Sequence, residues 1–157
     1  MNKPLCVVSC PIDTFSGYGA RSRDFVRSLI KEKGEEWDIK IIPQRWGDCP
    51  WNFLKDNDPL KQRFISGQMN QQPDIWFQIT VPNEFQPIGK YNVGVTAGIE
   101  TTIFPGEFIE GMNRMDLNLV SSEHSKNVAQ STQFEKKNEQ GQVIGVVKCE
   151  KPVEVLF

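Results

Sequence analysis

Short apolar runs alternate with amphipathic segments along most of the chain. The run over 5–10 is bounded by prolines, which predicts a central parallel strand covered on both faces. Over 23–33, apolar residues recur at helical spacing opposite charged ones, and Gly34 marks the end, which predicts a surface-packed helix. Further strands are expected over 37–42, 74–79, 91–96 and 117–120, with short helices over 59–65 and 107–114.

The pattern continues into the last third of the chain. Ser121 or Ser122 is placed to cap a helix that runs to about Ser131. Polar residues over 135–141 predict a turn, and 143–147 and 153–157 are expected to be strand pieces. This order of strands and helices predicts one α/β domain over 1–157, a three-layer sandwich of Rossmann-like type with a mostly parallel sheet.

Composition and charge narrow the classes of function. Eighteen basic and twenty acidic residues give a net charge of −2 without a basic tract, so tight binding to a nucleic-acid backbone is not indicated. The first apolar run is too short for a secretion signal or a membrane span, so we expect a cytoplasmic protein with four reduced cysteines. One histidine and no C-x-x-C pair make a metal site improbable, and no metal is expected.

Two glycines, Gly17 and Gly19, stand between the first predicted strand and the first predicted helix. One interpretation is a tight turn that needs positive φ. The other is a binding crevice, in which backbone N–H groups at the helix start approach an anionic or sugar ligand. Arg21, and less favourably Arg23, is placed to reach a phosphate or carboxylate, although a solvated helix position explains Arg21 equally well.

Three motifs in sequence order resemble the amino-terminal half of GT-B glycosyltransferases of the retaining, glycogen-synthase-like group. They are the glycine turn at 17–19, the strand and loop over 93–102 with the following Pro105, and the strand and cap over 120–126. The resemblance implies a hexosyltransferase domain on the acceptor side, transferring a sugar from a nucleotide-sugar donor to an unidentified acceptor. It also implies a separate donor-binding domain, which this chain lacks, and no cofactor besides the nucleotide-sugar co-substrate.

The resemblance also assigns site residues. Glu100 is the catalytic candidate, as a group that positions the acceptor rather than as a nucleophile. The residues expected to bind substrate or donor are Ser16, Gly17, Tyr18, Gly19, Arg21, Thr96, Gly98, Thr101, Ser122, His124 and Lys126. A capping-region surface histidine explains His124, and solvation explains Lys126, without any ligand. The hypothesis requires the loops that hold Tyr18 and Ile99 to share one rim of the sheet.

Other interpretations remain open. A non-catalytic α/β module that binds a carbohydrate or a nucleotide would use the same crevice. A nicotinamide-dependent oxidoreductase is weaker, because the third glycine of the dinucleotide fingerprint is missing. Trp46 and Trp51 are candidate platforms for a sugar ring, whereas Trp76 is expected in the core. The last four residues also resemble the start of a protease-cleavage tag, although the apolar alternation favours a native strand.

Overall fold

The computed structural model describes residues 3–14, 17–44, 53–55, 58–65, 71–96, 106–137 and 139–155. The chain divides into two compact units. The first unit comprises Met1–Thr80 and Pro87–Asn92, and the second comprises Val81–Gln86 and Val93–Phe157.

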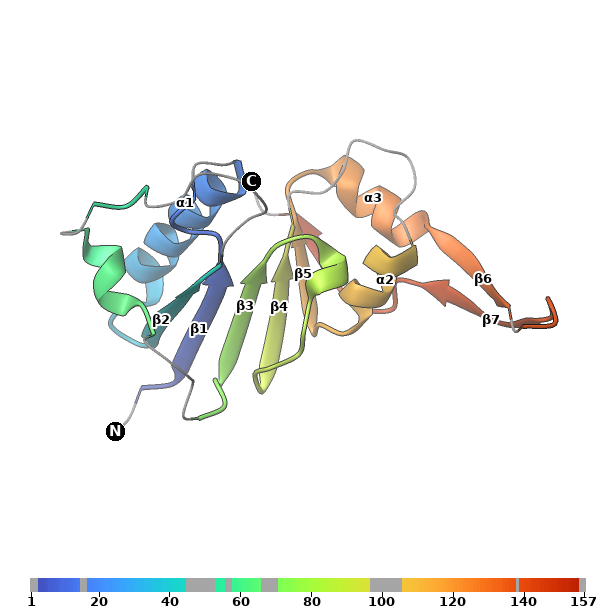
Figure 1. Cartoon of the computed structure of the whole chain (residues 1–157), viewed down its shortest axis with the longest axis horizontal. Helices are drawn as coiled ribbons and strands as arrows, with labels where there is room; N and C mark the ends of the chain where they lie inside the picture. The colour runs from blue at the N-terminus through green and yellow to red at the C-terminus, as the bar shows by residue number, and fades with distance from the viewer. Residues whose placement is uncertain are drawn as a thin grey trace. The chain divides into compact units, whose positions relative to one another are not determined.

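The first unit is built on three parallel strands in the order β2-β1-β3. Strand β1 (Leu5–Cys10) pairs on one side with β2 (Asp38–Pro43) and on the other with β3 (Ile75–Ile79). Figure 1 shows β1 and β2 side by side with helix α1 running across them. Cys6, Val7 and Val8 in β1 are fully buried, as the uninterrupted apolar run requires. The three strands predicted here are confirmed, with ends shifted by at most one residue.

Helix α1 (Gly17–Lys33) begins at the first glycine rather than at residue 23, so the glycine pair belongs to the helix. Its apolar face packs on the sheet, with Val26 buried and the Phe25 ring edge-on to Phe77 at a centroid distance of 5.3 Å. The helix predicted over 59–65 is the 3-10 helix η1 (Pro59–Arg63), which Asp58 caps by accepting a hydrogen bond from the Leu60 N–H.

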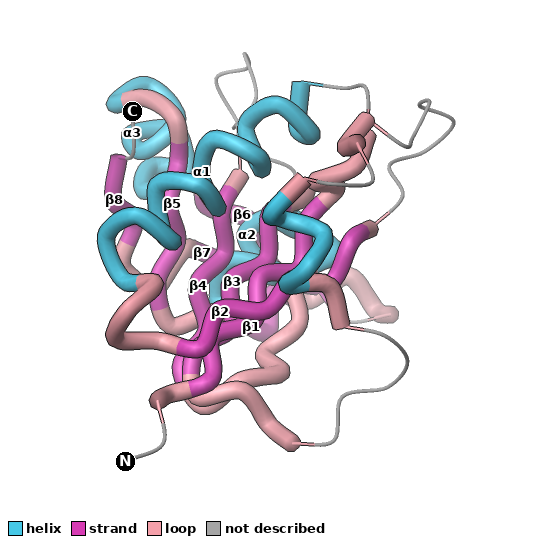
Figure 2. Tube along the Cα trace, turned by 90° about the vertical axis from the view of Figure 1, so that its left-hand side faces the viewer, coloured by secondary structure: helices cyan, strands magenta, loops and turns pink. Residues whose placement is uncertain are grey.

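The second unit contains the parallel strands β4, β5 and β8. The first two residues of strand β4 (Tyr91–Val95) belong to the first unit, and its other three belong to the second. Val93–Val95 pair with β5 (Leu117–Val120). Strand β8 (Val153–Val155) pairs with the other edge of β5 and lies beside it in Figure 2. Val153 is buried, which confirms a strand in the region predicted over 153–157.

Helices α2 (Gly106–Asn113) and α3 (Glu123–Ser131) alternate with these strands, and the short 3-10 helix η2 (Pro82–Glu84) contacts α2. After α3 the chain forms an antiparallel hairpin of β6 (Gln133–Lys137) and β7 (Val143–Lys148). The turn predicted over 135–141 is therefore wrong in its first part, because polar residues 135–137 pair with β7 as a strand. A turn does follow, and Gly141 in it has φ 82°.

All pairings of β1–β5 and β8 described within each unit are parallel, which confirms an α/β chain compatible with a Rossmann-like fold. In the described ranges, no helix combines the length and apolar character needed to span a membrane.

Candidate functional site

The candidate site in the first unit is the junction between β1 and α1. The structure brings Gly17, Tyr18, Gly19 and Arg21 together in the first two turns of α1, after the carboxyl end of β1. The first turn of α1 contains no aspartate or glutamate. The positive end of the helix dipole is therefore not offset by a carboxylate of that turn.

Gly19 is explained by a close approach rather than by positive φ, so the positive-φ interpretation is wrong at this residue. A Cβ built there would lie 2.6 Å from Thr14 Oγ1 and nearer still to the Thr14 carbonyl oxygen. The Thr14 hydroxyl in turn donates to the Pro11 carbonyl at 2.9 Å. The glycine thus lets the start of α1 pack against the loop that leaves β1.

Arg23 is not available to a ligand, which corrects its assignment as a second anion-binding candidate. Its side chain is buried, and Nη1 donates to the carbonyl oxygens of Ile12 at 2.9 Å and Thr14 at 2.8 Å. The guanidinium carbon lies 3.6 Å from the centroid of the Phe53 ring. Burial lowers the pKa of Arg23. Its charge therefore holds the loop after β1 in place.

Asp13 ties residues 53–55 to the same loop. The Asp13 carbonyl accepts from the Phe53 N–H at 3.0 Å, and its Oδ1 accepts from the Leu54 N–H at 2.7 Å. The Asp13, Arg23 and Phe53 cluster was not found from the sequence. Its members are not adjacent in the chain and follow no periodic pattern. Only Asp13, a turn-forming residue in the loop after β1, carried a local signal.

Cys10 ends β1 beneath this loop. Burial raises the pKa of its thiol to about 12, although a hydrogen bond with Ser22 opposes the shift. The Ser22 hydroxyl also donates to the Tyr18 carbonyl at 2.6 Å. Cys6, Cys10 and Cys149 are free thiols. Cys10 is therefore held as a neutral packing residue, not as a nucleophile.

The second unit holds the remaining described site residues at the carboxyl ends of β4 and β5. Thr96, directly after β4, is buried and donates its N–H to the Leu119 carbonyl at 3.0 Å. Ser122 caps α3, as predicted, by accepting from the Ser125 N–H at 3.1 Å. Because parallel neighbouring strands end at the same rim, Thr96 and Ser122 lie at one edge of this unit.

His124 and Lys126 follow that cap on α3. His124 is exposed in the first turn, as expected of a surface histidine. The Lys126 ammonium lies 3.9 Å from Glu154 Oε2 on β8, so the lysine that was expected to be solvated is paired with a carboxylate of its own unit. An anion that used Lys126 would compete with Glu154.

Several predicted residues lie outside the described ranges. They are Ser16, Trp46, Trp51, Gly98, Ile99, Glu100 and Thr101. Trp76 is buried in the core, as predicted.

In the part of the chain that the structure describes, no three His, Cys, Asp or Glu side chains are grouped so that they could hold a metal ion. No protein-family model matches the chain, and no curated protein sequence matches it either.

Proposed function

We propose that this chain is the acceptor-side domain of a GT-B glycosyltransferase, which transfers a sugar from a nucleotide-sugar donor to an acceptor. The proposal includes the three-layer Rossmann-like sandwich, half of a GT-B fold, that the sequence predicts for residues 1–157. The proposal rests on the resemblance of the three motifs, and the β1–α1 junction is the structural observation that supports it.

The junction has the chemistry that a sugar diphosphate needs. Helix α1 is 17 residues long and starts directly after a buried strand, with no acidic residue in its first turn. Gly19 lets the loop residue Thr14 pack closely against the helix start. Backbone N–H groups at such an end attract phosphate oxygens without a metal ion.

The residues then divide by role. Gly17, Tyr18 and Gly19 provide the backbone at the helix start, and Arg21 offers a guanidinium for a phosphate or a carboxylate. In the second unit, Ser122 and His124 at the start of α3 contact the donor, with Lys126 exchanging Glu154 for a phosphate. Glu100 positions the acceptor hydroxyl, and Thr96 and Thr101 line the acceptor side.

A binding experiment on the whole chain tests the proposal. UDP-glucose, ADP-glucose and GDP-mannose are titrated and followed by saturation-transfer NMR. We expect weak binding of at least one of them, and a loss of roughly tenfold in affinity for Arg21→Gln, since one charge-assisted contact is removed. Lys31→Gln is the matched control, because Lys31 is an exposed cation near the other end of the same helix.

A turnover assay separates an enzyme half from other functions. Because the proposal gives residues 1–157 only the acceptor-side role, donor hydrolysis and sugar transfer by these residues alone are expected to stay near background. Robust turnover would contradict a half-enzyme. Sugar-nucleotide affinity that Arg21→Gln leaves unchanged would remove the β1–α1 junction from the proposal. Saccharide binding that needs no nucleotide would favour the non-catalytic module.

A further inference from the structure

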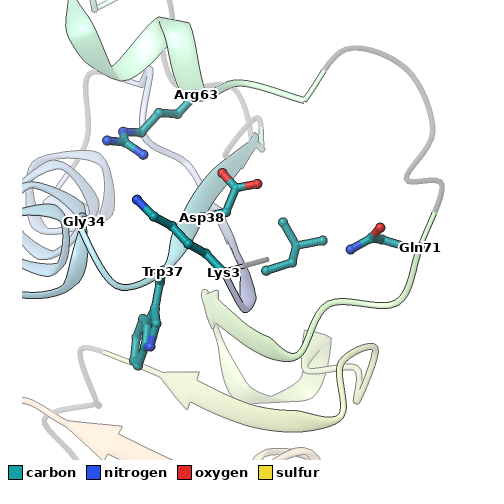
Figure 3. Close-up of a pocket in the computed structure, with 7 residues that line it drawn as sticks. Lys3, Gly34, Trp37, Asp38, Arg63 and Gln71 are labelled. Atoms are coloured by element: carbon teal, nitrogen blue, oxygen red, sulfur yellow. The ribbon is translucent and has the colours of Figure 1, made fainter. Parts of the chain in front are cut away.

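A cavity of about 570 Å³ lies at the opposite end of the strands of the first unit (Figure 3). Leu5 and Asp38, the first residues of β1 and β2, form part of its lining. Among the described residues, the lining comprises Lys3, Leu5, Gly34, Trp37, Asp38, Arg63 and Gln71. None of them belongs to the β1–α1 junction, so this cavity is a separate feature.

Two cationic side chains share the cavity. Figure 3 shows the Lys3 ammonium extending toward the Arg63 guanidinium. Arg63 donates through Nη1 to the Ile39 carbonyl at 3.1 Å, which uses one of its five N–H donors. Lys3 has no hydrogen-bond or ion-pair partner among the residues described.

The carboxylate of Asp38 in the lining has an ion-pair partner of its own. Asp38 forms its ion pair with Lys40, at 3.7 Å, on the same strand. Two like charges that face one cavity repel each other, and an anion placed between them turns that repulsion into attraction. Among the described lining residues the cations outnumber the carboxylates, which favours a negatively charged ligand.

The rest of the lining suits an organic group attached to such an anion. Trp37 is half-buried, and its ring points away from Lys3 and Arg63 (Figure 3), with the Lys33 ammonium 5.7 Å from the ring centroid. Gln71 is exposed and offers an amide donor and acceptor. The volume exceeds what a lone phosphate ion fills.

We propose that this cavity binds a phosphate monoester, with the phosphate between Lys3 and Arg63 and the organic part toward Gln71. The site lies at the amino ends of the strands, and the proposal does not depend on glycosyl transfer. A sugar phosphate and a nucleoside monophosphate carry the same recognised group, and the experiment distinguishes them.

The test is isothermal titration of the whole chain with AMP, glucose 6-phosphate, inorganic phosphate and adenosine. At least one monoester is expected to bind more tightly than inorganic phosphate, since its organic part adds contacts with the lining around Gln71. Adenosine is expected not to bind. Affinity should fall as salt is raised, because exposed charges are screened. The tighter of AMP and glucose 6-phosphate identifies the organic part.

Two substitutions locate the site. Lys3→Glu should weaken monoester binding by more than about tenfold, because it reverses a charge in contact with the phosphate. It should leave the fold intact, since Lys3 is exposed and unpaired within the described structure. Arg63→Lys keeps the charge and should retain most of the affinity, whereas Arg63→Gln should lose it.

Lys55→Glu is the matched control, an exposed cation of the same unit outside the cavity, and should leave binding unchanged. Three results would each overturn the proposal: no monoester binds, adenosine binds as well as AMP, or Lys3→Glu binds like the unchanged chain. Equal affinity for inorganic phosphate and both esters would overturn the assignment of an ester.

Discussion

Replacing Arg23 with methionine removes a buried cation that fastens the loop after β1, while keeping an unbranched apolar stem. Two hydrogen bonds are lost, from Nη1 to the Ile12 carbonyl at 2.9 Å and to the Thr14 carbonyl at 2.8 Å. A hydrogen bond that involves a charged group contributes about 1.5–3 kcal/mol. Stacking over Phe53 adds about 0.5–2 kcal/mol.

Part of that sum is offset by the cost of burying the charge, which is why the pKa of Arg23 is lowered. Only 6% of the residue is exposed, so water cannot replace the guanidinium at the two carbonyls. We therefore expect Arg23→Met to lower the free energy of unfolding by about 2–4 kcal/mol.

Urea unfolding followed by circular dichroism measures this loss, and Arg27→Met is the control. Arg27 lies one turn further along α1, its side chain is 51% exposed, and its partner is Asp58 at 3.3 Å. Such a surface pair contributes less than about 1 kcal/mol. If both variants lost the same free energy, or if Arg23→Met were the more stable chain, the argument that Arg23 fastens this loop would be refuted.

The remaining predictions concern packing, capping, thiol reactivity and acid stability. Gly19→Ala should lower the free energy of unfolding by about 1–2 kcal/mol, since overpacking against Thr14 outweighs the gain in helix propensity. Gly145→Ala, with open space around it, should cause no such loss, and urea unfolding compares the two variants. Ser122→Ala should cost about 1 kcal/mol, seen as faster amide exchange at Ser125. Cys10, with a pKa of about 12, should resist iodoacetamide at pH 8 in the folded chain and react in urea; mass spectrometry showing Cys10 labelled as fast as Cys149 would contradict this. The Leu5 N–H and the Lys90 ammonium lower the pKa of Asp74. The contribution of Asp74 to stability is therefore present at neutral pH and is lost as the pH falls through that lowered pKa. Asp74→Asn should flatten the acid side of the curve of stability against pH, measured by thermal melting.

Local sequence patterns predicted much of the fold. Strand β1 is an apolar run between prolines, and β5 was predicted with the bounds that it has, because buried parallel strands leave a continuous apolar signal. The cap at Ser122 was found because its chemistry depends on residues three positions apart. These sequence signals depend only on residues close together in the chain, so they can be read without the tertiary structure.

The errors arise where distant residues decide the structure. Helix α1 begins earlier than its apolar pattern. Its first turn packs against the loop after β1 through the close contact of Gly19 with Thr14, and this contact leaves no periodic apolar signal. Strand β6 is polar, so only its pairing with β7 makes it a strand. Arg23 was predicted as a second anion-binding candidate, and its burial depends on Phe53, far along the chain.

The same distinction separates the two candidate sites of the first unit. The β1–α1 junction is contiguous in sequence. Lys3 and Arg63, in contrast, line one cavity only because β1 and β2 pair in parallel and η1 follows them. One lies at the carboxyl end of β1 and the other at its amino end, so ligands at the two sites do not touch the same residues. Arg21→Gln should therefore weaken sugar-nucleotide binding alone, and Lys3→Glu should weaken binding of the tighter phosphate monoester alone. If each substitution weakened both ligands equally, they would share one site, and the separate assignment of the two ends would fail.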